Sequence, residues 1–85
     1  MRTFELQFSK VAQKDLNKIG DKYKPHIFAG FFELRKEPYL GKKLKGKFND
    51  CHSLRVGPYR VVYKVYKSKR DILVIRIGLR GNVYR

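Results

Sequence analysis

The chain has 85 residues, of which 42% are hydrophobic, and its 21 Lys and Arg against 7 Asp and Glu give a formal net charge of +14. This length allows one small domain, and the hydrophobic content is sufficient for a packed core, which excludes a disordered tail. So positive a charge favours polyanionic partners, above all nucleic acid, with an anionic membrane surface as the alternative.

No segment approaches the roughly 20 apolar residues of a membrane span, and the N-terminal MRTFELQFSK lacks the apolar run of a signal peptide. The sequence therefore predicts a cytoplasmic protein without a membrane partner. Cys51 is the only cysteine, and His26 and His52 are far apart, so neither a disulfide framework nor a metal site is predicted. We interpret Cys51 as a small, partly buried residue, in preference to a reactive nucleophile.

The N-terminal part of the chain predicts a strand followed by a helix. Residues 3–8 alternate between polar and apolar, as a half-buried strand does. Ser9 is well placed to cap a helix that ends near Gly20. Its apolar stripe falls at spacings of three or four: Ala12, Leu16, Ile19 and Tyr23.

A second helix is predicted from Pro25, which suits a first helical turn, to a stop at Pro38. Its apolar surface is unusually broad, comprising Ile27, Phe28, Phe31, Phe32 and Leu34. A stripe of this width predicts contact with two neighbours, the first helix and a sheet.

Residues 39–50 read as a glycine-containing loop that is rich in lysine. Its cationic residues are Lys42, Lys43, Lys45 and Lys47. The loop is either a solvated segment that Leu44 and Phe48 pin to the core, or a phosphate-gripping edge, and the sequence leaves both interpretations open.

The C-terminal third predicts three strands, over residues 51–56, 59–67 and 72–80, with Gly57-Pro58 as the turn between the first two. The expected fold is therefore α+β: an N-terminal strand, a two-helix hairpin and a three-stranded antiparallel meander. The helices are expected to pack on one face of the sheet.

Residue parity assigns the strand side chains to two faces, with Val56 opposite Tyr59 and Arg55 opposite Arg60. One face is predicted to be the core: Leu54, Val56, Tyr59, Val61, Tyr63, Val65, Leu73, Ile75, Ile77 and Leu79. The other face, left open by the helices, collects Ser53, Arg55, Arg60, Val62, Lys64, Tyr66, Arg76 and Arg80.

Facing arginines destabilise a sheet, and no carboxylate on the three strands has the parity to neutralise them. The open face is thus predicted to bind an anion, the alternative being an ordinary polar sheet surface. If the anion is an RNA phosphate, guanidinium groups suit the charge that develops on it. His52 is expected to point to the core as a structural residue. Tyr84 could stack on a base, transfer a proton or simply pack along the tail.

Several segments resemble the RelE/ParE superfamily of toxin–antitoxin toxins. They are the helical SKVAQKDLNKI, the loop KKLKG, the hairpin LRVGPYRVVYKV and the ending IRIGLRGNVY, in the same order of elements. The resemblance covers nearly the whole chain and implies one RelE-like toxin domain over residues 1–85.

The resemblance implies two activities, both restrained by an antitoxin. RelE-like toxins are endoribonucleases that enter the ribosome and cut mRNA by 2′-hydroxyl attack without metal or other cofactor. ParE-like toxins share the fold but poison DNA gyrase. The expected function is ribosome-dependent mRNA cleavage. The alternatives are a gyrase poison and a catalytically impaired toxin that only binds its antitoxin.

The family's site residues match Arg55, Arg60, Arg80 and Tyr84 of this sequence, which are the expected catalytic set. Ser53 departs from the pattern, because the ribonuclease members carry a lysine there; Lys45, Lys47 or His52 is a candidate to replace it. Contacts to RNA or to the ribosome are expected from Lys42, Lys43, Lys45, Lys47, Lys64 and Arg76. The antitoxin segment is expected to be acidic and partly apolar, and to cover the arginine face or add to a sheet edge.

Overall fold

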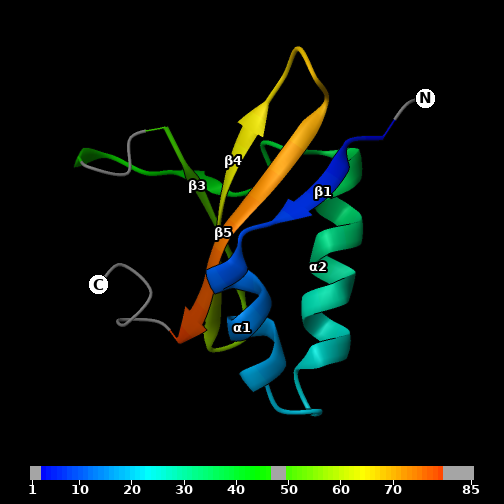
Figure 1. The fold of residues 1–85 in the computed structure, drawn as a ribbon, viewed down its shortest axis with the longest axis vertical. Helices are drawn as coiled ribbons and strands as arrows, with labels where there is room; N and C mark the ends of the chain where they lie inside the picture. The colour runs from blue at the N-terminus through cyan, green and yellow to red at the C-terminus, as the bar shows by residue number, and fades with distance from the viewer. Residues whose placement is uncertain (1–2, 47–49, 80–85) are drawn as a thin grey trace.

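Two helices cover one face of a five-stranded mixed sheet in the computed structural model, which describes residues 3–46 and 50–79 (Figure 1). The elements are β1 (Glu5–Phe8), α1 (Lys10–Lys18), α2 (Lys24–Lys36), β2 (Lys42–Lys43), β3 (His52–Val56), β4 (Tyr59–Tyr66) and β5 (Asp71–Leu79). The strand order is β1-β5-β4-β3-β2, with β1 parallel to β5 and the other pairs antiparallel. The predicted α+β class and meander are confirmed, and β2 is a short strand inside the segment predicted to be a loop.

Ser9 links β1 to α1, and its hydroxyl makes one hydrogen bond to the helix and one to the sheet. Its hydroxyl accepts a hydrogen bond from the backbone N–H of Ala12 at 3.0 Å, which caps α1 as predicted. The same hydroxyl donates to the carbonyl of Ile75 at 2.8 Å. Ser9 therefore fixes the start of α1 against β5.

Helix α1 also supplies a hydrogen-bond partner to the outer edge of β5. Strand β1 covers this edge only as far as Phe8, which lies opposite Val74. Further along, the backbone N–H of Ile77 donates to Asp15 Oδ2 at 3.0 Å. The Nε of Arg76 lies 3.5 Å from the same oxygen. A side chain of α1 thus replaces the strand partner that β1 no longer supplies.

The main core lies between the helices and the sheet. It contains Phe4, Ala12, Ile19, Ile27, Phe31, Leu34, Val61, Tyr63, Ile72, Val74 and Ile77. The broad apolar stripe of α2 is only partly buried, since Phe28 and Phe32 remain 51% and 56% exposed. The prediction that this whole stripe meets two neighbours is wrong for these two residues. The physical reason is that α1 packs mainly on β5 and β1, leaving this flank of α2 uncovered.

A β-bulge in the pairing of β4 with β5 changes which side chains of β5 face the core. Val62 pairs with Arg76 but Tyr63 pairs with Val74, so Ile75 is an extra residue. Before the bulge, Ile72 and Val74 are therefore fully buried in the main core. The predicted inward placement of Leu73 and Ile75 is wrong because the extra residue reverses the parity of everything N-terminal to it in β5.

The β3–β4 hairpin has the predicted register, with Val56 opposite Tyr59 and Arg55 opposite Arg60. Gly57 begins the two-residue turn with φ at +57°, a conformation that disfavours other residues.

We expect Ser9→Ala to lower the free energy of unfolding by about 2 kcal/mol, because it removes the helix cap and leaves the Ile75 carbonyl without its donor. Urea denaturation followed by circular dichroism measures this loss. The matched control is Ser68→Ala in the exposed β4–β5 turn, expected to change stability by no more than about 0.5 kcal/mol. Equal midpoints for the two variants would contradict the double role of Ser9.

Candidate functional site

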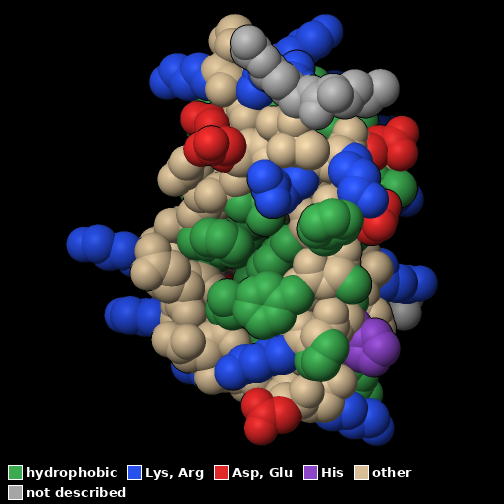
Figure 2. Space-filling view, turned by 90° about the vertical axis from the view of Figure 1, so that its right-hand side faces the viewer, with side chains coloured by type: hydrophobic (Ala, Val, Ile, Leu, Met, Phe, Trp, Pro, Cys, Tyr) green, Lys and Arg blue, Asp and Glu red, His purple; other side chains and the backbone are tan. Residues whose placement is uncertain are grey.

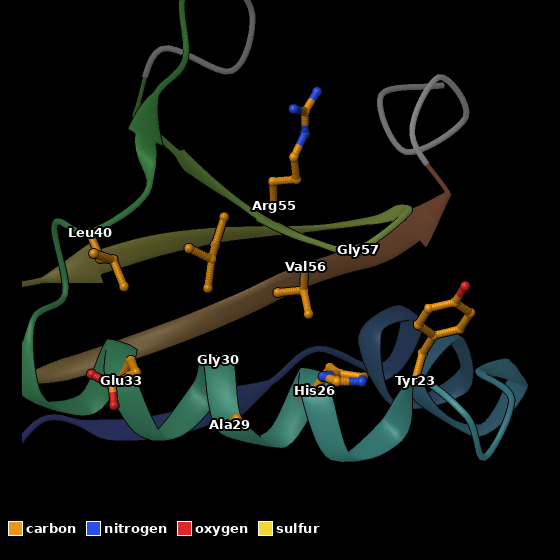
Figure 3. Close-up of a pocket in the computed structure, with 10 residues that line it drawn as sticks. Tyr23, His26, Ala29, Gly30, Glu33, Leu40, Arg55, Val56 and Gly57 are labelled. Atoms are coloured by element: carbon orange, nitrogen blue, oxygen red, sulfur yellow. The ribbon is translucent and has the colours of Figure 1, made fainter.

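Arg55 and Arg60 lie side by side on the face of the sheet that the helices leave open. They are direct partners across β3 and β4, and Arg55 is exposed while Arg60 is half-buried. Figure 3 shows Val56 directed at α2 and Arg55 directed to the opposite side of the sheet. Arg60 Nη1 donates to Ser53 Oγ at 3.5 Å, and Ser53 is only 4% exposed. A buried hydroxyl therefore contacts one of the two guanidinium groups.

Strand β2 brings one lysine of the basic segment to this open face. Lys42 pairs with Ser53 and so shares its face, whereas Lys43 pairs with His52 and shares the helix side. The chain before β2 can pack this closely against β3 and β4 only because residue 41 is glycine. The N–H of Gly41 donates to Tyr63 Oη at 2.9 Å. A Cβ at Gly41 would lie 2.7 Å from that oxygen and 2.8 Å from the Ser53 carbonyl, closer than any real contact.

Lys64 and Arg76 occupy the middle of the open face but differ in their partners. The Nζ of Lys64 lies 5.3 Å from the ring centroid of Tyr66, a cation–π contact. Arg76 reaches over the edge of β5 to Asp15, whose side chain is 12% exposed. Sequence reasoning missed Asp15, since nothing in a helix sequence tells which strand an acidic residue beside the apolar stripe will meet.

The open face also carries carboxylates, contrary to the sequence prediction. The bulge in β5 places Asp71 on this face opposite Tyr66, and Glu5 of β1 pairs with Asp71. Both acids lie at the end of the sheet away from the hairpin that bears Arg55. The face is therefore polarised, with Arg55 and Arg60 at the hairpin end and these two acids at the other.

A small second apolar cluster lies between the arginines and the basic segment. It consists of Cys51 and Val62, with Leu44 and Ile75 packed against them. Val62 is 1% exposed, so this predicted open-face residue is in fact covered. Burial raises the pKa of the Cys51 thiol. The charge of Lys64 lowers this pKa in part, and the charge of Asp50 raises it further. Cys51 is thus a packing residue, and Leu44 pins the basic segment to the sheet.

His52 lies on the helix side, as parity predicted, and not with the arginines. Its ring stacks on Tyr63 at 5.6 Å and meets Tyr39 edge-on at 5.5 Å. Burial lowers the pKa of His52, and the nearby charge of Lys43 lowers it further. Among the described residues its buried Nδ1 has no hydrogen-bond partner. The imidazole is therefore a neutral packing element under the sheet.

A groove of about 400 Å³ separates α2 from β3 on this same helix side (Figure 3). Its floor is largely apolar and includes Leu40, Leu54 and Val56. Gly30 shapes it, because a Cβ there would lie 3.2 Å from Val56 and 3.3 Å from Leu54. Arg55 also borders the groove, but its guanidinium group points to the opposite side of the sheet (Figure 3), so this groove is not the anion site.

The remaining predicted site residues divide into two groups. Lys45 is exposed beside Gly46, next to β2. Lys47, Arg80 and Tyr84 lie outside the residues that the structure describes. Over residues 3–46 and 50–79 no group of three His, Cys, Asp or Glu side chains is arranged to hold a metal ion. In the same ranges no helix is long and apolar enough to cross a membrane.

This arrangement can bind an anion and stabilise negative charge on it. Two guanidinium groups project from adjacent strands, and planar donors of this kind match phosphate oxygens. Lys42 and Lys64 add positive charge to the same face. Facing arginines oppose sheet formation, so an anion between them would stabilise the pair.

Comparison with known families gives a match over residues 6–84 to the model described as "ParE toxin of type II toxin-antitoxin system, parDE". Among curated proteins, Toxin RelG of Mycobacterium tuberculosis is 28% identical over 88 residues, covering 96% of this chain and 97% of the relative. Toxin RelE of the same organism is 30% identical over 84 residues, covering 96% and 87%.

Solved structures show the same similarity. The toxin–antitoxin complex RelBE2 of M. tuberculosis contains a chain with a TM-score of 0.84 and 25% identity, covering 92% of this chain and 99% of that one. The isolated RelE toxin of E. coli has a TM-score of 0.80 and 29% identity, covering 95% and 90%.

We expect the protein to lose stability as the pH falls below about 6.5, the ordinary pKa of histidine, partly through His52. Its pKa is lower in the folded state, so the unfolded state binds more protons and acid favours unfolding. His52→Phe keeps an aromatic ring against Tyr63 but cannot titrate. The variant should therefore lose less stability than the wild type between pH 7.5 and pH 5, as measured by urea midpoints.

The control is His26→Gln, which removes an exposed histidine from α2 and should lose as much stability as the wild type. A His52→Phe variant with the full acid sensitivity of the wild type would show that His52 is not responsible.

Proposed function

Given that this chain belongs to the RelE/ParE superfamily of toxins of type II toxin–antitoxin systems, we propose that it is a ribosome-dependent endoribonuclease that cleaves mRNA. The observation that carries the proposal is the facing pair Arg55 and Arg60 on the open face of the sheet. Curated relatives named RelE and RelG, similar over nearly their whole length, support the choice of this branch.

The chemistry requires three events at one phosphate. The 2′-hydroxyl loses its proton and its oxygen attacks phosphorus, negative charge grows on the phosphoryl oxygens, and the bond to the 5′-oxygen breaks as that oxygen gains a proton. The products are a 2′,3′-cyclic phosphate and a free 5′-hydroxyl. In this proposal Arg55, Arg60 and Arg80 hold the phosphate and stabilise its charge. Tyr84 stacks on a base or transfers a proton.

Arg60 is the best supported member of this set. Its contact with the buried Ser53 hydroxyl restricts the guanidinium, and its partner across the sheet adds a second positive charge. A donor held in place before the reaction stabilises the transition state more effectively than a mobile one, because no reorganisation is needed. Lys42, Lys43, Lys45, Lys47, Lys64 and Arg76 would then attract the polyanionic ribosome and mRNA.

Poisoning of DNA gyrase is the second candidate, favoured by the description of the matching family model as ParE. In that case the arginine face would be a binding surface and no RNA phosphate would be cleaved. A toxin that only binds its antitoxin is the third candidate, to which the buried Ser53, at the family's lysine position, lends support. An antitoxin partner is common to all three, and relatives have been solved in toxin–antitoxin complexes.

The test is to map transcript 5′ ends by primer extension after brief induction of the wild type or of an Arg60→Ala, Arg80→Ala double variant. We expect new ends within translated codons for the wild type and a loss of at least about 100-fold in cleavage for the variant. The matched control, Lys14→Ala with Lys18→Ala on exposed positions of α1, removes the same charge and should cleave normally.

Growth arrest with intact transcripts and broken DNA would contradict the proposal in favour of gyrase poisoning. Cleavage by the arginine variant at the wild-type rate would remove the arginine face from the mechanism. Fragments without a 2′,3′-cyclic phosphate would exclude the 2′-hydroxyl route.

A further inference from the structure

The open face of the sheet carries a small pocket at the end away from the arginine pair. The pocket has a volume of about 140 Å³ and is lined by Gln7, Tyr66, Lys69, Asp71 and Leu73. Its walls come from β1, β4, β5 and the turn between β4 and β5. We call it the tyrosine pocket. Its residues take no part in the proposed cleavage chemistry, so they need another explanation.

Strand pairing brings the polar, aromatic and apolar walls of the tyrosine pocket together. Tyr66 pairs with Asp71 across β4 and β5, and Gln7 of β1 pairs with Leu73. Direct partners in a sheet share a face, so these four side chains lie in two adjacent rows of the open face. Asp71 and Leu73 face this way only because the bulge at Ile75 reverses the parity of this part of β5. The pocket is therefore a consequence of the bulge.

Tyr66 gives the pocket an accessible aromatic ring. It is 36% exposed, whereas Tyr63 on the helix side of the same strand is fully buried. The Nζ of Lys64 lies 5.3 Å from the centroid of the Tyr66 ring. An aromatic ring on an open sheet surface is a platform on which an unpaired RNA base stacks. A cation beside the ring suits the phosphates of the same RNA strand.

The polar groups of the pocket determine which bases fit. The carboxylate of Asp71 only accepts hydrogen bonds, while the amide of Gln7 both donates and accepts. A carboxylate on a surface that attracts polyanions weakens the general attraction, so its position beside Tyr66 indicates that it accepts from a specific donor. Adenine, cytosine and guanine present such a donor, the exocyclic amino group. Uracil presents carbonyl oxygens instead.

We propose that the tyrosine pocket is a subsite for one unpaired base of the RNA substrate, and that it favours adenine, cytosine and guanine over uracil; this inference rests on the proposed ribonuclease function. The base stacks on Tyr66, its amino group donates to the carboxylate of Asp71, and the amide of Gln7 pairs with a neighbouring group on the same edge. The subsite contacts RNA away from the reacting phosphate. It therefore determines which transcript positions are cut and leaves the cleavage chemistry unchanged.

The position of the subsite along the RNA follows from the length of β4. Arg60 and Tyr66 lie near the two ends of this strand and are about 20 Å apart at the usual rise of a strand. Lys64 lies between them on the same face and is available to the connecting RNA backbone. The phosphate held by the arginines and the base held by Tyr66 are therefore a few nucleotides apart, so the preferred base has a fixed position relative to the cut.

The experiment maps all new transcript 5′ ends by sequencing after brief induction of the wild type, Tyr66→Leu, Tyr66→Phe or Asp71→Asn. In the wild type, one position at a fixed distance from the cut should be depleted of uracil. Asp71→Asn keeps the size of the side chain but adds a donor for a uracil carbonyl, so this depletion should disappear. Tyr66→Leu should lower cleavage about 10-fold through lost stacking, and Tyr66→Phe should restore it.

The matched control is Phe28→Leu, which removes an aromatic ring from another surface. Phe28 is 51% exposed and belongs to α2. Figure 2 views the molecule from this helix side and shows hydrophobic side chains gathered in its middle. The control variant should cleave at the wild-type rate with the same base preference. Circular dichroism and thermal unfolding check that every variant keeps the fold.

A binding measurement tests the subsite without cleavage. The purified proteins are titrated with short single-stranded oligonucleotides of cytidine or of uridine. The wild type should bind the cytidine oligonucleotide at least about fivefold more tightly, because one discriminating base contact has this effect. Asp71→Asn should abolish the difference, and Tyr66→Leu should weaken binding of both oligonucleotides.

Equal binding of the two oligonucleotides by the wild type, with the same cut positions in the wild type and Asp71→Asn, would overturn the subsite. It would leave the proposed ribonuclease function intact. Conversely, a wild-type protein that cuts no transcripts but prefers the cytidine oligonucleotide, and loses this preference in Asp71→Asn, would overturn the proposed function and support the base-binding pocket.

Discussion

The backbone of β5 needs hydrogen-bond partners along both of its edges, and the rest of the structure depends on how they are supplied. One edge pairs with β4 from end to end except at the bulge residue Ile75, while the other pairs with β1 only as far as Val74. Beyond that point Ser9 and Asp15 of the α1 region bind the backbone of Ile75 and Ile77. The first helix is therefore tied to the sheet by polar contacts, which fixes the side that both helices cover and so leaves the arginine face open.

The two surfaces with most binding potential lie on opposite sides of the sheet and have different chemistry. The arginine face combines like charges on adjacent strands, an arrangement that costs stability without an anion. On the helix side, Phe28 and Phe32 of α2 expose apolar area that the core does not use. In each case the fold leaves a feature that the rest of the chain does not balance, like charges on one side and exposed aromatic rings on the other.

The sequence predicted much of the fold and part of the candidate site, and the errors on β5 share one cause. Strand alternation and the cap at Ser9 are local, as is the turn at Gly57, and they were predicted correctly. The bulge at Ile75 was not predicted, because an extra residue in one strand is visible only against its partner. That single residue reverses the parity of the first part of β5, and so it also hid the carboxylate of Asp71 on the open face.

By itself, the sequence determined the net charge, the order of helices and strands, and the pairing of Arg55 with Arg60, since these depend on composition, periodicity and a two-residue turn. Only the tertiary structure decided which polar groups meet across the chain, such as Asp15 with Arg76, and which apolar side chains find no cover. Whether Phe28 is buried or exposed depends on where α1 packs. The position of α1 is fixed by the part of the β5 edge that β1 leaves unpaired, and not by any property of α2.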